Sequence, residues 1–389
     1  MILDGLKVIE LAGVLAGPSA GMFLAELGAE VIKIENPATG GDVTRGWKLP
    51  DEEPLNNITT YFSCANWGKK SIGVNVNSPE GKEIIYKLIK DADVVITSYK
   101  KGDDVKLGMD YETLKAFSQH IIYASISGYG EDDDRIAYDA VLQAECGFMY
   151  MNGTPESGPL KFPVAIIDLF AAHQLKQAIL LAIINRYKTG EGSKVNVSLW
   201  QSALSALANQ ATNYLMEGHI AKLEGSEHPN IAPYGDTFIT KEGRNILLAV
   251  GSNKQFETLC HILYIEKILA DERFADNRSR LKNRPALKAF LADAIYGWNS
   301  AELISALKNN NVPAGLVKSI AEALDSDPND FIHSSSHYKA ISQLAFAAGS
   351  IGNVLQPPVL GEHTDLILSG KLNFTADKIE QLRTENIVA

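Results

Sequence analysis

Short apolar runs alternate with helical patterns along the first half of the chain, and this alternation constrains the fold more than any other feature. The runs rich in valine and isoleucine lie at residues 6–11, 30–35, 71–76, 94–97 and 121–125. A helical pattern over 19–27 stops at Gly28, and a second one begins at Ser78 and Pro79. Strands that are joined through helices pair in parallel. The sequence therefore predicts an α/β fold with a Rossmann-like parallel sheet covered by helices.

The length of 389 residues indicates more than one structural unit, because a single hydrophobic core rarely exceeds about 250–300 residues. A helix over 168–188, a strand over 194–198 and a helix over 200–217 close the first large unit. Turn-rich sequence follows at residues 223–234. We therefore predict a large discontinuous domain made of residues 1–222 and 318–389, with a smaller α+β domain, residues 223–317, between its two parts.

The charge balance excludes some classes of partner. The sequence has 36 lysines and arginines against 47 aspartates and glutamates, whereas broad binding to nucleic acid needs a basic face. No stretch approaches the about 20 apolar residues of a membrane-spanning helix, and charged residues interrupt the apolar N-terminus. We therefore expect no nucleic-acid or membrane partner and no signal peptide. The three cysteines, Cys64, Cys146 and Cys260, are scattered, which favours reduced thiols in a cytoplasmic protein without a metal site.

The loop after the first predicted strand has the sequence AGVLAGP over residues 12–18. Its glycines, followed by Glu35 at the end of the second strand, suggest a dinucleotide site. However, a G-x-G-x-x-G motif that starts at Gly13 would need glycines where Leu15 and Pro18 stand. The spacing therefore argues against an NAD site and favours a tight turn from strand to helix.

Lysines cluster at strand and loop ends, at positions 69, 70, 100, 101 and 106. They could bind phosphate groups, although loop lysines are more often solvated. His333 and His337 have the spacing of two metal ligands on one helix. Because no cluster of carboxylates accompanies them, a surface helix or loop is the better interpretation.

Asp168 stands at the start of a long apolar helical pattern. A helix N-cap, worth about 1 kcal/mol, is the ordinary role of an aspartate at such a position. The same position also suits chemistry, because the helix dipole stabilises a carboxylate and any oxyanion that forms beside it. The residues alone leave both interpretations open.

Several motifs in a fixed order resemble family III coenzyme A transferases of the CaiB/BaiF type, which include formyl-CoA and carnitine-CoA transferases. The resemblance covers nearly the full length. Its segments are LAGVLAGP (11–18), GAEVIKIE (28–35), KKS (69–71), IYASISGYG (122–130), YDAVLQAECG (138–147), RYKTGEGSKVNVS (186–198), HPN (228–230), PY (233–234), NVPAG (311–315) and LGEHT (360–364). The resemblance implies an enzyme that moves CoA between carboxylic acids, without a metal, as a homodimer of two interlinked ring-like subunits.

The resemblance also implies the site. Asp168, 30 residues after Tyr138 in the Tyr138-Asp139 motif, matches the family's nucleophile. It would form an aspartyl anhydride and then an aspartyl-CoA thioester, a form of covalent catalysis. A glycine-bearing loop over 251–255 would stabilise oxyanions. The residues implied to bind CoA are Leu15, Ala16, Asn36, Lys69, Lys70, Ser98, Tyr99, Lys100, Lys106, Tyr138 and Asp139; Lys70 is included because Asn36 stands where the family often has a basic residue.

Two alternatives remain beside CoA transfer. The family includes 2-methylacyl-CoA racemases, whose proton transfer needs acid and base groups on both faces of the substrate carbon. Those racemases carry a histidine where Tyr138 stands, and a tyrosine is a poor base near neutral pH. The other alternative is a non-catalytic paralogue that binds CoA. The retained Asp168 argues against it.

Overall fold

The structure, a computed structural model, describes residues 1–223, 225–326, 331–346 and 354–389. The chain divides into a larger unit, which comprises Met1–Cys146, Pro163–Ala208 and Asp330–Ala389, and a smaller unit, which comprises Gly147–Phe162 and Asn209–Asn329. The predicted boundaries differ from this division, because residues 209–222 and 318–326, and also the segment 147–162, were assigned to the large domain. Gly153 in this segment accepts a hydrogen bond from Gly225 N at 2.7 Å, a partner that is distant in sequence.

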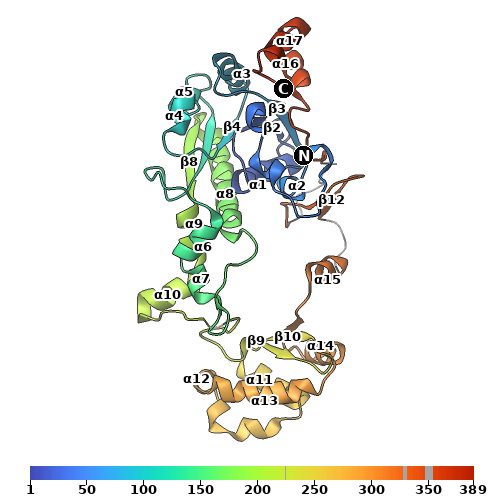
Figure 1. Ribbon diagram of the computed structural model, residues 1–389. Helices are drawn as coiled ribbons and strands as arrows, with labels where there is room; N and C mark the ends of the chain where they lie inside the picture. The colour runs from blue at the N-terminus through green and yellow to red at the C-terminus, as the bar shows by residue number, and fades with distance from the viewer. Residues whose placement is uncertain (224, 327–330, 347–353) are drawn as a thin grey trace. The chain divides into compact units, whose positions relative to one another are not determined.

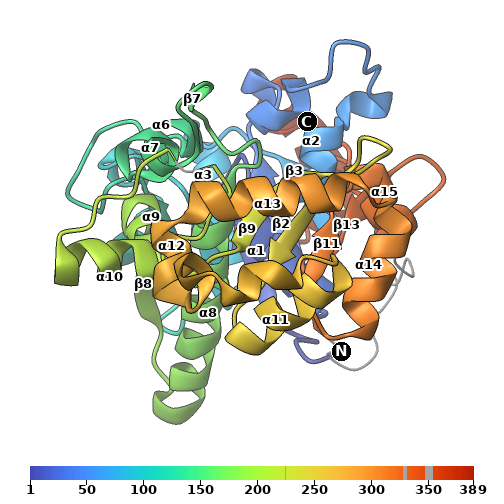
Figure 2. The same cartoon turned by 90° about the horizontal axis from the view of Figure 1, so that it is seen from below.

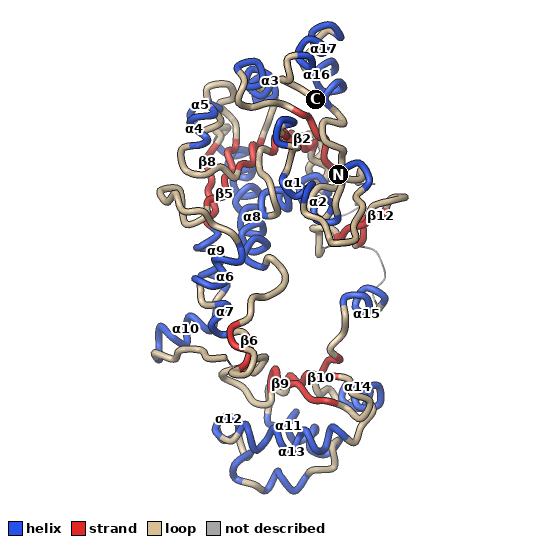
Figure 3. Tube along the Cα trace, viewed as in Figure 1, coloured by secondary structure: helices blue, strands red, loops and turns tan. Residues whose placement is uncertain are grey.

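Six parallel strands form the sheet of the larger unit, in the order β3-β2-β1-β4-β5-β8 (Figure 1). They are β1 (Lys7–Glu10), β2 (Glu30–Glu35), β3 (Lys69–Gly73), β4 (Val94–Thr97), β5 (Ile122–Ser127) and β8 (Ser193–Ser198). Figure 3 shows them in red. This confirms the predicted parallel sheet. The strand order reverses between β1 and β4, and ligands of such sheets bind at the carboxyl ends of the strands at this point.

Helices cover both faces of this sheet. Because successive strand side chains point to opposite faces, Ile9, Ile32 and Val95 all reach one face, where they form an apolar cluster with α3, α5, α16 and α17. On the other side α1 and α8 contact the strands and each other. The helices of this unit are α1 (Ala16–Glu26), α2 (Thr60–Ser63), α3 (Pro79–Ile89), α4 (Asp103–Leu107), α5 (Tyr111–Lys115), α6 (Asp139–Glu145), α8 (Ile166–Thr189), α9 (Leu199–Ala206), α16 (Thr364–Gly370) and α17 (Ala376–Thr384).

The helix α8 is long and apolar enough, by length and composition alone, to cross a membrane, which corrects the expectation that no stretch approaches that length. Its residues Ile167, Leu175 and Ile179 are fully buried against the rest of the larger unit, as in a core helix of a globular protein. Another difference concerns the predicted helix over 200–217. It is two helices, because Ala208 adopts a left-handed backbone with φ 45° between α9 and α10.

The C-terminal segment covers β3 at the edge of the sheet. The His363 amide donates to the Ser71 carbonyl at 2.9 Å, and the Gly73 amide donates to Thr364 Oγ1 at 3.1 Å. The Ala389 amide then donates to the Gly73 carbonyl at 3.2 Å. These bonds satisfy backbone groups that an edge strand would otherwise expose.

A hairpin of β12 (Ile332–Ser334) and β13 (Lys339–Ile341) contains the two histidines with metal-like spacing. His333 Nε2 lies 2.6 Å from Glu26 Oε1, and its ring stacks on Trp67. His337 is exposed in the turn. His333 is therefore a partly buried strand residue and not part of a surface helix or loop. Within the described ranges, no three His, Cys, Asp or Glu side chains gather as a metal-binding group.

The smaller unit has its own core, in which Phe238, Leu248 and Leu291 are buried. Its antiparallel sheet has the strand order β11-β10-β9, and α13 packs against β9 (Figure 2). This agrees with the predicted α+β composition. The elements are α7 (Phe148–Met151), β6 (Gly153–Thr154), β7 (Gly158–Pro159), α10 (Ala208–Glu217), β9 (Tyr234–Ile239), β10 (Asn245–Ala249), α11 (Asn253–Ile262), α12 (Asn277–Lys282), α13 (Arg284–Tyr296), α14 (Ser300–Asn309), β11 (Ala314–Leu316) and α15 (Ile320–Asp325).

Candidate active site

A cavity of about 580 Å³ opens at the carboxyl ends of β1, β4 and β5, where the strand order reverses. Loops that follow these strands form its walls, at residues 13–17, 97–102 and 127–139, and every lining residue belongs to the larger unit. This is the position at which doubly wound parallel sheets bind their ligands. The cavity is therefore the candidate active site.

Eight of the residues that were assigned to the site from the sequence line this cavity. They are Leu15, Ala16, Ser98, Tyr99, Lys100, Tyr138, Asp139 and Asp168. They come from four separate segments of the chain, which the parallel sheet and the start of α8 bring together.

Asp168 is the third residue of α8 and is half-buried. It is not the N-cap, which is Ala165. Instead, Asp139 serves the start of α8 from another helix, since its Oδ1 accepts from Ile167 N at 2.8 Å. Its other oxygen accepts from Gln143 Nε2 at 2.7 Å. The ordinary role first considered for Asp168 is therefore filled by Asp139, and Asp168 faces the cavity.

The environment of Asp168 disfavours its charge. Burial, and then the negative charge of Asp139, raise the pKa of the Asp168 carboxyl to about 7. Burial and the charge of Asp168 likewise raise the pKa of Tyr61, in α2, to about 12. A carboxyl whose pKa is shifted toward neutral pH is common at functional sites.

Four residues assigned to CoA do not line the cavity. Lys69 is fully buried, and its ammonium lies 2.8 Å from Glu10 Oε2 while donating to the Pro18 carbonyl and Asn66 Oδ1, each at 2.9 Å. It has no free side toward a phosphate. In this structure Lys69 does not reach the cavity, because the pleat of β3 turns its side chain under α1, and its implied phosphate contact stays a prediction.

The other three have local partners at other places. Lys70 points to the opposite side of β3 and pairs with Glu30 at 2.7 Å. Lys106 is exposed and pairs with Asp103 at 3.1 Å. Asn36 accepts a bond from Ala38 N at 3.0 Å and caps a short 3₁₀ turn. The structure does not bring these side chains to the cavity.

Other basic side chains line the cavity: Lys101, one of the clustered lysines that could bind phosphate, and Lys194 and Arg135, which were not predicted from the sequence. Lys101 Nζ donates to the Asp132 carbonyl at 2.6 Å, and Lys194 Nζ lies 2.5 Å from Glu131. Arg135 pairs with Asp133 at 2.8 Å and lies over the Tyr129 ring. A sequence signal existed, since residues 131–135 read EDDDR directly after a predicted strand.

The glycine-bearing loop over 251–255 lies in the smaller unit. The Gly251 amide donates to Gln255 Oε1 at 3.0 Å, and Ser252 caps α11. Its implied role in stabilising oxyanions stays a prediction.

Comparison with known proteins identifies the family of this chain. Residues 3–364 match CoA-transferase family III. The succinate–glutarate CoA-transferase of Agrobacterium fabrum is 40% identical over 332 residues, 84% of this chain and 82% of that protein. The succinyl-CoA:glutarate CoA-transferase of Mus musculus is 32% identical over 399 residues, 99% of this chain and 90% of that protein. The crystal structure of a CAIB/BAIF family protein from Brucella suis is 37% identical, has a TM-score of 0.84, and covers 95% of this chain and 99% of its own. The chain therefore belongs to CoA-transferase family III and is a CoA-transferase.

Proposed function

We propose that this CoA-transferase moves CoA from a short dicarboxyl-CoA thioester to a free dicarboxylate through a covalent intermediate on Asp168. The observation that carries the proposal is the position of Asp168, whose side chain lines the cavity beside the loops implied to hold CoA. The similar transferases of Agrobacterium fabrum and Mus musculus are named for succinate, or its CoA ester, and glutarate. Their names support dicarboxylic substrates with four and five carbons.

The chemistry balances as two exchanges of the same kind. The ionised Asp168 carboxylate attacks the thioester carbonyl, which forms an anhydride and releases the CoA thiolate. The thiolate attacks the aspartyl carbon of this anhydride, which forms aspartyl-CoA and frees the donor acid. The acceptor carboxylate attacks the aspartyl carbon of aspartyl-CoA, which forms a second anhydride and again releases the thiolate. Finally the thiolate attacks the acceptor's acyl carbon, which gives the new acyl-CoA and restores Asp168.

The substrate assignment is tested with succinyl-CoA and a panel of free acids. We expect glutaryl-CoA to form with glutarate, whereas butyrate, which lacks the second carboxylate, should react at least about tenfold more slowly in kcat/KM, equal to about 1.4 kcal/mol. Product CoA esters are separated and identified by mass spectrometry. Faster transfer to butyrate than to glutarate would contradict the dicarboxylate proposal while leaving CoA transfer intact.

Transfer to a free acid distinguishes a CoA-transferase from the two alternatives. A racemase would exchange the α-proton of 2-methylacyl-CoA for deuterium without transfer to any free acid. A non-catalytic paralogue would bind CoA and exchange with none. The names of the similar proteins support transfer over both, Tyr138 in place of histidine argues against the racemase, and the retained Asp168 argues against the paralogue.

The pH dependence of transfer follows from the raised pKa of Asp168. Because the ionised carboxylate is the nucleophile, kcat/KM should rise with pH through an apparent pKa of about 7. In Asp139→Asn the neighbouring negative charge is lost, so the pKa of Asp168 should fall and the rise in kcat/KM should move to lower pH. Asparagine keeps an oxygen for the Ile167 amide. The measurement is kcat/KM between about pH 5 and 9; the same midpoint in both proteins would contradict the assignment.

We also propose the interlinked homodimer. The face of α8 that carries Leu181, Ile184 and Tyr187 supports it, because these apolar side chains are 51–82% exposed. Light scattering on the purified protein should give twice the mass of the chain, and a monomer would contradict it. The three free cysteines support a cytoplasmic location.

A further inference from the structure

Val14, in the loop between β1 and α1, has a strained backbone. Its φ is 70°, in the left-handed region, where a β-branched residue is a genuine outlier. Such a strained conformation persists only where the surroundings impose it. Val14 and its neighbours Gly13, Leu15 and Ala16 line the cavity. The strain therefore shapes a wall of the active site.

Asp42 contacts the strained residue directly. Both of its carboxylate oxygens lie 3.3 Å from Val14 N, which donates to them. The same carboxylate accepts from Thr44 N at 3.1 Å and Thr44 Oγ1 at 2.8 Å, and pairs with Lys33 at 2.9 Å. Burial alone would raise the pKa of Asp42, but the charge of Lys33 and the bonds from Lys33 and Thr44 hold it below its usual range. Asp42 is therefore a buried, fixed carboxylate.

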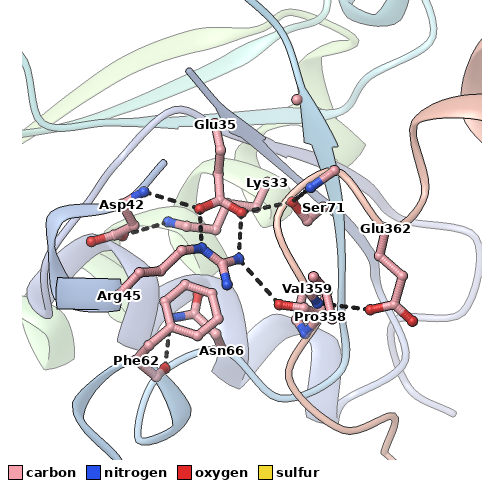
Figure 4. Close-up of polar contacts among 12 residues, drawn as sticks. Lys33, Glu35, Asp42, Arg45, Phe62, Asn66, Ser71, Pro358, Val359 and Glu362 are labelled. Atoms are coloured by element: carbon pink, nitrogen blue, oxygen red, sulfur yellow. Dashed lines mark hydrogen bonds and ion pairs between the residues drawn. The ribbon is translucent and has the colours of Figure 1, made fainter. Parts of the chain in front are cut away.

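Lys33 ties this carboxylate to the start of the loop. Its ammonium is 1% exposed and lies between Asp42 and Glu10, with Glu10 Oε1 at 3.1 Å. It also donates to the Ala12 carbonyl at 2.8 Å. The opposite charges of Glu10 and Asp42 outweigh its burial, so its pKa is raised and it stays cationic. Figure 4 shows Lys33 directed at Asp42. It also shows Glu35, which accepts hydrogen bonds from Asp42 N and Arg45 Nε and so extends the network.

Neither Asp42 nor Lys33 lines the cavity, so neither is placed to touch the substrate. Both hold backbone atoms of the loop, at Val14 and Ala12. We propose that Asp42 and Lys33 are positioning residues, which hold the β1–α1 loop in the strained conformation that receives the CoA moiety. The inference rests on the proposed function only in that this loop contacts CoA.

The test is Asp42→Asn, which keeps the size of the side chain but removes the charge opposite Lys33. On this proposal the loop contacts CoA and not the reacting carbon. A disturbed loop should therefore weaken the binding of the substrate and of the transition state alike. We expect the Kd of CoA and the KM of acyl-CoA to rise about tenfold, with kcat changed by less than about threefold. Asp91→Asn is the control, because Asp91 is an exposed carboxylate paired with Lys7.

Val14→Gly provides a rescue that a merely structural role for Asp42 would not show. Glycine adopts positive φ without strain, so the loop would need Asp42 less. In the Val14→Gly background, Asp42→Asn should raise the Kd of CoA by less than about threefold, a non-additivity expected of coupled residues. An equal rise in both backgrounds, or a loss of kcat with unchanged KM, would overturn the proposal.

Two further measurements cover the cases in which Asp42→Asn does not fold or the proposed substrates do not react. If Asp42→Asn does not fold, Thr44→Val removes only the 2.8 Å hydroxyl bond and leaves the charge of Asp42 in place. Its Kd for CoA should rise about threefold, an effect that Val14→Gly should again reduce, and an unchanged Kd would overturn the proposal. Calorimetric binding of CoA needs no turnover. A dicarboxylate panel that fails while CoA binding responds as expected would reject the proposed substrates and leave the positioning role standing.

Discussion

Replacement of Asp168 with asparagine is expected to lower kcat for CoA transfer by on the order of 10³-fold or more. The amide has nearly the same shape as the carboxylate but cannot attack a thioester carbonyl to form an anhydride. Because Asp139, and not Asp168, accepts the hydrogen bond from the Ile167 amide, the start of α8 should keep its structure in this variant. Activity should therefore fall while the melting temperature stays within a few degrees.

Trapping with hydroxylamine gives the decisive readout for this variant. Wild-type protein incubated with succinyl-CoA should yield a hydroxamate that peptide mass spectrometry maps to Asp168, and the variant should yield none. Glu80→Gln is the control, because Glu80 is an exposed acid in the first turn of α3. Wild-type activity in Asp168→Asn, with an intact mass that rules out deamidation, would reject the covalent mechanism.

The second large effect should appear in stability, at two adjacent lysines. Lys69→Met removes a cation that is fully buried against Glu10 and breaks its bonds to the Pro18 carbonyl and Asn66. Loss of one partner of a buried pair costs about 3–5 kcal/mol of unfolding free energy. Lys70→Met breaks a pair with Glu30 that is about 30% exposed on the lysine side, and should cost less than about 1 kcal/mol.

Thermal and denaturant unfolding of the two variants measure this contrast. The pair also tests whether Lys69 contacts a phosphate. If it did, Lys69→Met would weaken CoA binding and leave the melting temperature unchanged. We expect the opposite result for Lys69→Met. The melting temperature should fall, and CoA affinity should fall only because the β1–α1 loop is disturbed.

The fold of the larger unit could be predicted largely from local patterns. The alternation of apolar runs and helices locates the parallel sheet, because each strand is short, buried and followed by a helix signal. The assignment of residues 147–162 to the smaller unit could not be predicted, since the partners of this segment, such as Gly225 for Gly153, are distant in sequence. The break at Ala208 depends on a single backbone angle, which the helical pattern of its neighbours conceals.

The site was predictable in part. Asp168 could be located only by resemblance, because by itself an aspartate at a helix start indicates a cap. The burial of Lys69 could not be predicted, because the two lysines at 69 and 70 look alike in sequence and only the pleat distinguishes the buried one from the surface one. The pairing of Lys194 with Glu131 joins separate segments, so no local pattern reveals it.

The covering of β3 by the C-terminal segment has a consequence for how the chain is made. The edge strand forms from residues 69–73, whereas the bonds that satisfy its backbone groups come from residues 363–389, which leave the ribosome much later than β3. During synthesis, this edge remains open to strand addition by other chains, which is a route to aggregation. Slow elongation, which prolongs this interval, should therefore lower the yield of soluble protein.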